Sequence, residues 1–128
     1  MKAPRVLVID DNDMNIQLAT FVLKRAAFDV ESAANAMDGM RKISDFEPDL
    51  ILMDIQMPDM DGLVLTRHLK SSASTRHIVI VAFTAYAMKG DERKMRQAGC
   101  DGYISKPIDV KTLPAQVRAF CASAAGVD

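Results

Sequence analysis

The sequence contains few of the residues on which disulfide-bonded, metal-thiolate or membrane-spanning structures depend. It has no tryptophan and two cysteines, Cys100 and Cys121, whose separation matches no metal-binding motif. The chain also shows no signal peptide. The small number of cysteines therefore predicts reduced thiols rather than a disulfide. No apolar run approaches the roughly 20 residues that a membrane-spanning helix requires. These absences predict a soluble, cytoplasmic protein that has no membrane partner.

The chain also lacks an excess of charge of either sign. Its 16 lysines and arginines stand against 17 aspartates and glutamates, which gives a formal net charge of −1. A chain balanced in this way has no overall positive field to hold nucleic-acid phosphates, so direct nucleic-acid binding is not expected. With 128 residues, 49% of them hydrophobic, the sequence predicts a single domain over residues 1–128 with no output domain.

Short apolar runs alternate with longer segments of mixed polarity along the chain. Runs of strand length occupy residues 6–9, 50–53, 78–83 and 103–104. A fifth, weaker strand is expected at residues 30–33, at an edge of the sheet. Segments of helical length and pattern occupy residues 13–27, 34–46, 61–70, 91–98 and 109–121. Strands that alternate with helices predict an α/β fold: a doubly wound, five-stranded parallel sheet of flavodoxin-like order 2-1-3-4-5.

Residues that suit helix ends predict where these segments start and stop. Four aspartates are expected to be N-caps, whose carboxylates accept hydrogen bonds from the first free N–H groups of a helix: Asp13, Asp61, Asp91 and Asp109. Gly99 suits the left-handed position just beyond a helix.

Apolar spacing predicts which side of each terminal helix faces the sheet. In the first helix the expected inward stripe is Met14, Leu18, Phe21 and Val22. Ile16 falls on the opposite side, where it is either ordinary surface apolarity or part of a docking face. In the last helical segment the spacing predicts four buried residues: Val110, Leu113, Val117 and Phe120.

Acidic residues follow two strands that are neighbours in the predicted sheet. Asp10 and Asp11 follow the first strand, and Asp54 follows the third. In parallel sheets the carboxyl ends of the strands share one rim, so these carboxylates should repel one another strongly. A single acid at a strand end often caps a helix or is solvated, and we interpret Asp13 and Asp59 in that way. Three converging carboxylates with no histidine or cysteine beside them instead favour an Mg²⁺ site.

The same rim carries the groups that phosphoryl transfer needs. A strand delivers Asp54 into a turn, where its carboxylate can attack a phosphoryl group and form an aspartyl phosphate. Lys106, after the last strand, would pair with the phosphate, and the Thr84 hydroxyl would donate to a phosphate oxygen. Taken alone, Thr84 is also an ordinary strand residue and Lys106 an ordinary surface lysine.

Four segments that span nearly the whole chain, "VIDDN", "LILMDIQMPDMDG", "AFTAYAMKGD" and "GCDGYISKPI", resemble the receiver domains of two-component response regulators. Within this CheY-like superfamily the chain is most similar to DivK-like single-domain regulators. The resemblance implies that Asp54 is the phosphoacceptor. It also implies that Asp11, Asp54 and the Gln56 carbonyl bind Mg²⁺, and that Asp10 contacts the ion through water.

The resemblance further implies a phosphorylation switch. Lys106 would bind the phosphoryl group, Thr84 would move toward it, and Tyr103 would then turn inward. The Lys106–Pro107 bond is expected to be cis. The chain would catalyse only its own phosphotransfer and slow autodephosphorylation.

The resemblance also implies two kinds of protein partner. A histidine kinase or histidine phosphotransfer protein would dock on the first helix and on the loop after the last strand, with Ile16 and Pro107 as contacts. A downstream protein would read the face formed by the fourth helix, the fifth strand and the fifth helix.

Four alternatives stay open at this point. The chain could be a receiver module from a hybrid histidine kinase, or a scaffold with vestigial acids. A phosphatase of the haloacid dehalogenase type fits less well, because it would have D-x-D after its first strand. A flavodoxin-like electron carrier fits poorly, because "DDNDMN" would repel a flavin phosphate and no tryptophan is present to stack on the ring.

Overall fold

The computed structural model describes residues 3–57, 61–85 and 89–125. Strands and helices alternate through these residues as the sequence predicts, with boundaries that differ by a few residues. The elements are β1 Arg5–Ile9, α1 Asp13–Arg25, β2 Asp29–Ala33, α2 Ala36–Phe46, β3 Leu50–Asp54, α3 Gly62–Ser71, β4 Val79–Thr84, α4 Lys89–Ala98, β5 Gly102–Ser105 and α5 Leu113–Ala125.

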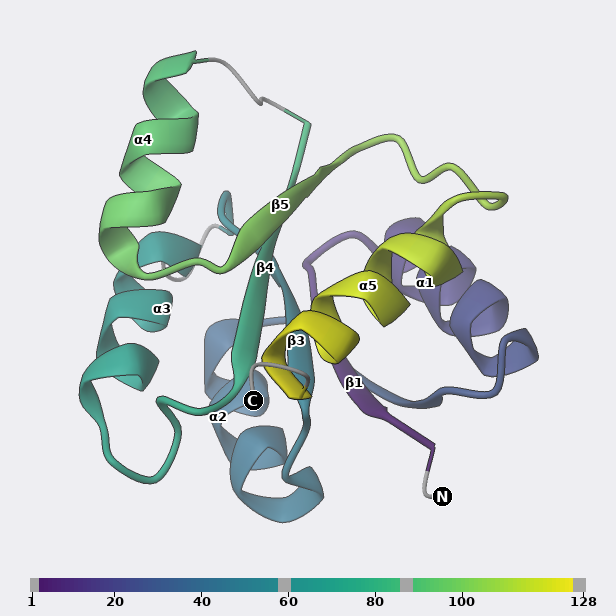
Figure 1. Cartoon of the computed structure of the whole chain (residues 1–128), viewed down its shortest axis with the longest axis horizontal. Coiled ribbons are helices and arrows are strands. Elements are labelled where there is room, and N and C mark those ends of the chain that lie inside the picture. Colours follow the sequence, from purple (N-terminus) through teal and green to yellow (C-terminus); the bar gives the residue numbers. More distant parts are fainter. Residues whose placement is uncertain (1–2, 58–60, 86–88, 126–128) are drawn as a thin grey trace.

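All the strand pairs are parallel, and the strand order is β2-β1-β3-β4-β5 (Figure 1). Both features were predicted, as was the place of β2 at an edge. The register puts Ile9 opposite Met53, and Asp54 opposite Phe83. Strands aligned in this way end together, so the residues that follow them gather at one rim of the sheet.

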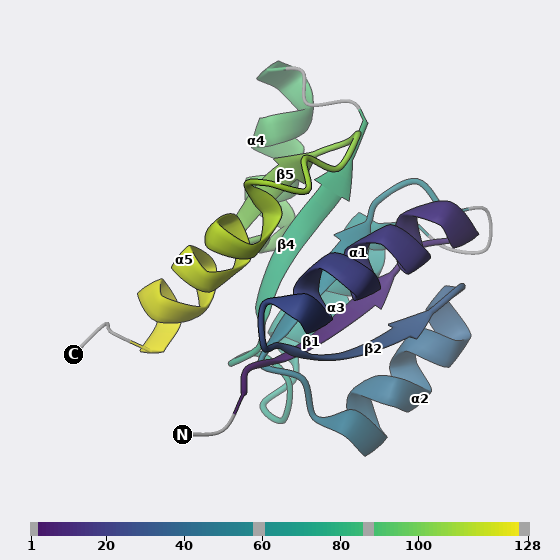
Figure 2. The same cartoon turned by 90° about the vertical axis from the view of Figure 1, so that its right-hand side faces the viewer.

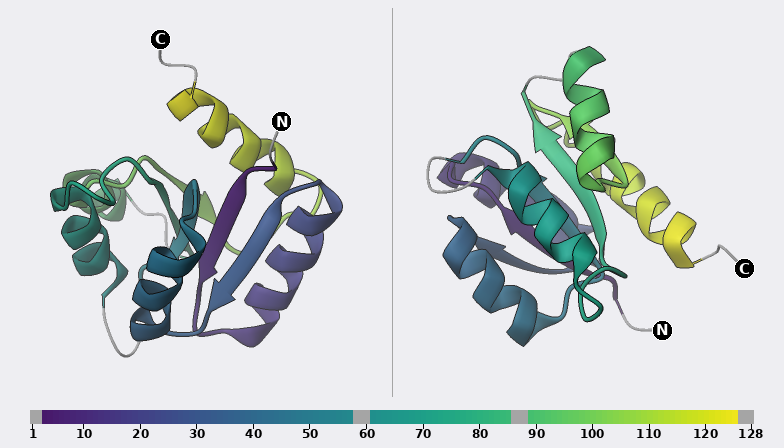
Figure 3. Two further views of the ribbon diagram at one scale, coloured as in Figure 1. Left: turned by 90° about the horizontal axis from the view of Figure 1, so that it is seen from below. Right: turned by 90° about the vertical axis from the view of Figure 1, so that its left-hand side faces the viewer.

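The sheet separates two hydrophobic cores. Side chains alternate along each strand, so Val6 and Val8 contribute to the core beneath α1 and α5, which lie together in front of the strands in Figure 2. Leu7 and Ile9 contribute to the other core, which is covered by α2, α3 and α4 (Figure 3, right). Because both faces of the sheet are covered, the central strands β1, β3 and β4 are largely unbroken apolar runs, whereas the edge strands β2 and β5 are not.

The caps of α1 and α3 show one wrong and one correct prediction. Asn12, not Asp13, is the N-cap of α1, and its Oδ1 accepts hydrogen bonds from the N–H groups of Met14 at 2.9 Å and Asn15 at 3.2 Å. Asp13 is instead the first helical residue. Asp61 caps α3 as predicted.

Of three predictions about the ends of α4 and α5, two were wrong and one was correct. The prediction that α4 starts at an Asp91 cap was wrong, because this helix already begins at Lys89. Asp109 does not cap α5 directly: its carboxylate accepts the Lys111 N–H at 3.0 Å and closes a turn that precedes the helix. Gly99 has φ +105°, as a left-handed position beyond a helix requires.

The predicted inward face of α1 was wrong for Met14, Leu18 and Phe21, whereas Val22 is buried as predicted. Met14 is 79% exposed and Phe21 is 60% exposed, whereas Ala19 and Leu23 are fully buried. Ile16, which was expected on the outer side, packs against the core beneath α1 and α5. Apolar residues lie on two sides of α1, and the side that carries Ala19, Val22 and Leu23 is the one that packs against the core.

The prediction for the last helix was mostly correct. Leu113 and Val117 are buried, and Phe120 is partly buried against the same core. Val110 is 48% exposed, because it lies in the turn before α5 begins and not on the helix.

Cys100 and Cys121 are free thiols, as predicted. Burial is the main cause that raises the pKa of each thiol, so both stay protonated and are poor nucleophiles.

Among the residues that the structure describes, no helix is long and apolar enough to cross a membrane.

Candidate functional site

The predicted acidic cluster is present at the carboxyl ends of β1 and β3. Oxygen atoms from Asp10, Asp11 and Asp54 all lie within 4.8 Å of one another. Asp10 and Asp54 are buried and Asp11 is exposed, so the cluster opens to solvent on one side. Oxygen ligands that converge in this way suit a hard divalent cation such as Mg²⁺.

Asp10 is held by the backbone on both sides. Its own N–H donates to the Ala33 carbonyl at 3.0 Å, and its Oδ1 accepts the Asn12 N–H at 2.9 Å. Its Oδ2 lies 2.8 Å from Lys106 Nζ, but their geometry is not that of a hydrogen bond, and within the described part of the chain this buried oxygen has no hydrogen-bond partner. A buried carboxylate oxygen in that condition fits a site that receives a cation or its bound water.

Asp54 is the last residue of β3, and the chain turns sharply after it. Its Oδ1 accepts the Gln56 N–H at 2.9 Å, and Gln56 pairs with Asp61 in an isolated antiparallel bridge. The chain then returns so closely that a Cβ on Gly62 would lie 2.3 Å from the Asp54 carbonyl oxygen. Glycine at 62 therefore permits the turn that presents the Asp54 carboxylate at the rim.

Lys106 brings the positive charge to this rim. Its Nζ lies 3.7 Å from Asp54 Oδ2 and 5.0 Å from the centre of the Phe83 ring. Its N–H donates to the Thr84 carbonyl at 2.8 Å, which ties the end of β5 to the end of β4. The Lys106–Pro107 peptide bond is cis, as the resemblance implied.

The electrostatic state of Asp54 follows from its surroundings. The pKa of Asp54 is raised from 3.8 to about 6, chiefly by burial and in smaller part by the neighbouring Asp10 and Asp11. The Gln56 N–H and the Lys106 ammonium act in the opposite direction. Three carboxylates face one lysine here, so the ionised site carries an excess of negative charge.

Thr84 and Tyr103 lie where the sequence predicted. Thr84 is buried at the end of β4, beside Ser105 of β5. Tyr103 is 37% exposed and lines a surface groove together with Met95 and Phe120.

The predicted docking residues behave differently from each other. Pro107 is exposed beside the rim. Ile16 is half-buried against the core, and its role as a docking contact stays a prediction. Asp59 lies outside the described residues.

Sequence reasoning missed Asn12 as part of the site, and it placed Gly62 in the turn after Asp54 without finding the close backbone approach that requires glycine there. Asn12 caps α1 and also fixes Asp10 through its backbone N–H, and a backbone donor leaves no mark in a sequence. Gly62 carried a weak signal, because a glycine directly after the expected cap Asp61 indicates a close approach of two backbone segments.

Comparison with known proteins identifies the class that this fold and site define. The family model for the response regulator receiver domain matches residues 6–118, and the chain belongs to that family. It is thus a receiver domain of two-component signalling. The chain is 38% identical over 119 residues to the polar-differentiation response regulator DivK of Brucella anthropi. The aligned residues cover 93% of this chain and 97% of that protein.

Solved structures show the same class. A response regulator receiver domain protein (CheY-like) from Methanospirillum hungatei aligns with a TM-score of 0.89 and 26% identity, covering 99% of this chain and 100% of that chain. The receiver domain of a signal transduction histidine kinase from Syntrophus aciditrophicus aligns with a TM-score of 0.84 and 27% identity, covering 94% and 92%.

Proposed function

We propose that this receiver domain is a phosphorylation-dependent switch in which Asp54 accepts a phosphoryl group from a phosphohistidine. The donor would be a histidine kinase or a histidine phosphotransfer protein. One observation carries the proposal: the buried Asp54 carboxylate lies at the rim with Asp10 and Asp11 on one side and with Lys106 Nζ 3.7 Å from its Oδ2 on the other.

The reaction is the transfer of one phosphoryl group. A carboxylate oxygen of Asp54 attacks phosphorus, the new O–P bond forms, and the P–N bond to the donor imidazole breaks with its electron pair returning to the ring nitrogen. The product is an acyl phosphate on Asp54. The Lys106 ammonium, held close by Asp10, is placed to stabilise the negative charge that the phosphoryl oxygens bring.

Four groups would hold Mg²⁺ at this site. Asp11, Asp54 and the Gln56 carbonyl would be direct ligands, and Asp10 would act through water. When bound, the ion neutralises charge on the phosphoryl oxygens. Two observations support this assignment: the all-oxygen donor set within 4.8 Å, and the buried Asp10 Oδ2, which accepts no hydrogen bond from the described residues although Lys106 Nζ lies 2.8 Å away.

Phosphorylation would change the surface formed by α4, β5 and α5. The Thr84 hydroxyl would move toward the phosphoryl group and Tyr103 would turn inward, which is a population shift driven by one added charged group. Two placements support this idea: Thr84 lies at the rim, and Tyr103 stands on the neighbouring strand with more than a third of its surface exposed. A downstream protein would bind the altered surface.

We infer that the chain is not an enzyme with a separate substrate. It would catalyse only its own phosphotransfer and slow autodephosphorylation. Similarity to the receiver domain of a histidine kinase favours a second role, a relay in which Asp54 passes its phosphoryl group to a histidine phosphotransfer protein. Loss of label from Asp54 to such a protein, without release of phosphate, would distinguish the relay from the terminal switch.

Intact-mass measurement tests the assignment of Asp54. Wild type, Asp54→Asn and Asp13→Asn would each be incubated with acetyl phosphate and, separately, with an active histidine kinase, with and without Mg²⁺. We expect wild type and Asp13→Asn, a matched exposed acid outside the cluster, to gain one phosphoryl group in Mg²⁺ alone. Asp54→Asn should gain none. A gain by Asp54→Asn, or no gain by wild type from either donor, would contradict the proposal.

A further inference from the structure

The net charge of −1 conceals a strong separation of charge along the chain. Residues 1–61 contain six lysines and arginines and twelve aspartates and glutamates, a formal charge of −6. Residues 62–99 contain seven lysines and arginines and two aspartates and glutamates, a formal charge of +5, and they also contain both histidines. The remaining residues are neutral, with three of each sign. The segment that forms α3, β4 and α4 is therefore strongly basic, although the whole chain is not.

The exposed basic residues of this segment lie on two neighbouring helices and on the loop between α3 and β4. Helices α3 and α4 are neighbours over the same face of the sheet, and they meet near the C-terminal end of α4 (Figure 1 and Figure 3, right). The Lys70 side chain of α3 reaches the backbone at Gly99, just beyond α4. We use the name basic surface for five exposed residues of α3, the loop after it, and α4: Arg67, Arg76, Arg93, Lys94 and Arg96.

Most of this positive charge has no acidic partner. Arg96 pairs with Glu92 at 3.0 Å, and Lys70 beneath the surface pairs with Asp101 at 2.8 Å. The other four members of the basic surface form no ion pair with a described acid. Helix dipoles account for basic residues in a last turn, such as Arg96, but not for Arg93 near the middle of α4. Like charges gathered without partners repel one another, so an acidic ligand would relieve a local repulsion.

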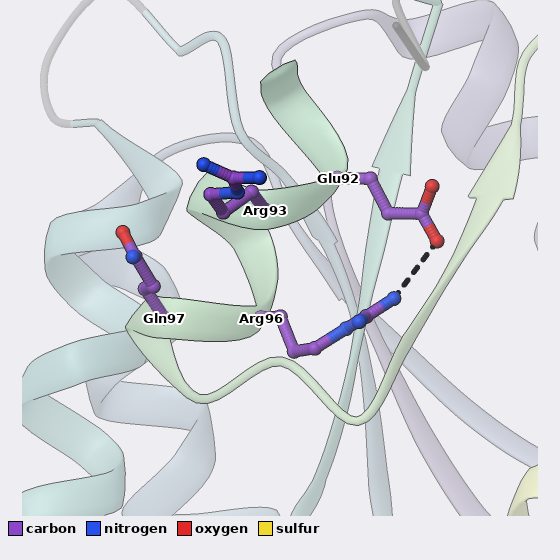
Figure 4. Close-up of a pocket in the computed structure, with 4 residues that line it drawn as sticks. All are labelled: Glu92, Arg93, Arg96 and Gln97. Carbon is purple, nitrogen blue, oxygen red and sulfur yellow. Dashed lines mark hydrogen bonds and ion pairs between the residues drawn. The ribbon is translucent and has the colours of Figure 1, made fainter. Parts of the chain in front are cut away.

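The surface is also shaped to receive side chains. A hollow of about 350 Å³ on α4 is lined by Glu92, Arg93, Arg96 and Gln97. In Figure 4 the Arg96 guanidinium turns to Glu92 on the β5 side of the helix, while Arg93 and Gln97 lie on the other side. Guanidinium groups offer forked donors that match carboxylates, and the Gln97 amide adds a further donor.

We propose that the basic surface binds an acidic, aspartate- and glutamate-rich segment of a partner protein. Nucleic acid fits less well, because a long polyanion would be repelled by the half of the molecule that carries −6. A second copy of the chain, whose acidic half could meet this surface, is an alternative that the experiment below distinguishes. The proposal goes beyond phosphotransfer and does not depend on it.

A charge-reversal experiment with a matched control tests this inference. One triple variant changes Arg67, Arg93 and Lys94 to Glu, and the control changes three exposed cations elsewhere, Lys24, Arg41 and Lys111, to Glu. Both variants have a formal net charge of −7. The probes are a fluorescent dodecamer of glutamate and a fluorescent 20-base-pair duplex, followed by anisotropy at low and physiological salt.

We expect wild type to bind the glutamate peptide more tightly than the duplex, with an affinity that falls as salt rises. The surface triple should weaken peptide binding by about tenfold or more, and the control triple by less than about threefold. Equal losses in the two triples, no binding by wild type, or tighter binding of the duplex would overturn the proposal. So would salt-sensitive self-association of wild type that the surface triple abolishes. Thermal melting checks folding, and Arg67→Gln, Arg93→Gln and Lys94→Gln together replace the reversal triple if it unfolds.

Discussion

Asp54 experiences opposing effects from burial and from Lys106. Its side chain is only 5% exposed, and removal from water disfavours the carboxylate form that a nucleophile needs. Lys106 Nζ at 3.7 Å and the Gln56 N–H at 2.9 Å favour that form, but burial has the larger effect and the pKa rises to about 6. Near neutral pH the carboxylate is therefore ionised at a cost in folding free energy.

This imbalance predicts a pH-dependent gain of stability in Asp54→Asn. A carboxyl group whose pKa is higher in the folded than in the unfolded chain gives stability that is complete below about pH 4 and is lost as pH rises through about 6. At pH 8 without divalent ions, the variant should exceed wild type by about 1 to 3 kcal/mol in free energy of unfolding. At pH 4.5 the difference should fall to about a third of its value at pH 8, because the unfolded carboxyl is then still mostly ionised.

Urea unfolding of both proteins at the two pH values measures this difference. Asp13→Asn, which replaces an exposed acid near the same rim, serves as the control and should show no comparable gain. A difference between wild type and Asp54→Asn that is the same at both pH values would contradict the explanation.

At the level of elements, the strands were predictable and the orientation of α1 was not. Strand positions were clear because a strand buried on both faces needs an unbroken apolar run, and acids that end two such runs must meet at the rim. In α1, however, apolar residues lie on two sides of the helix. One side carries Met14 and Phe21, and the other carries Ile16 and Leu23. Which side is buried depends on how the helix packs against β1 and α5. That information is absent from the helix itself.

Helix caps were partly predictable for a related reason. Asn12 and Asp13 are equally good N-cap types, so the sequence leaves their order open. In the structure Asn12 is the cap. β1 ends at Ile9, and the Asn12 N–H donates to the Asp10 carboxylate, which fixes the backbone just before the helix begins. The site residues that follow strands were therefore found from the sequence, whereas the backbone donors that position them required the structure.

The corrected face of α1 predicts unequal effects of two matched substitutions. Ile16→Asp places a charge against the core and should lower the free energy of unfolding by about 2 to 3 kcal/mol. Met14→Asp, at a position that is 79% exposed, should change it by less than about 0.5 kcal/mol. Thermal or urea unfolding measures both. Equal losses would contradict the assigned face, and a loss confined to Met14→Asp would restore the orientation expected from the sequence.

At the level of the whole molecule, the acidic rim joins segments that are distant in sequence. Asp10 and Asp11 follow β1, Asp54 ends β3, and Lys106 follows β5. An ion held by the first three would bind the folded chain and not the unfolded one. Binding at this rim should therefore stabilise the fold as a unit.

Added Mg²⁺ should raise the melting temperature of wild type. At a concentration a hundredfold above the dissociation constant, binding adds about 2.7 kcal/mol to the free energy of unfolding, which is several degrees for a domain of this size. Asp11→Asn should lose the shift and Asp13→Asn should keep it. Calorimetry with MgCl₂, compared with NaCl at equal ionic strength, measures the effect. A shift that survives in Asp11→Asn would contradict the assigned ligands.

The division between the −6 and +5 segments has a practical consequence for handling the protein. An isoelectric point near 6.1 suggests an anion-exchange column at pH 7.5 and no retention by a cation exchanger. A molecule whose charges lie on separate regions can instead present either region to a resin. We therefore expect retention by both resin types at low salt, and the surface triple should lose retention by the cation exchanger alone.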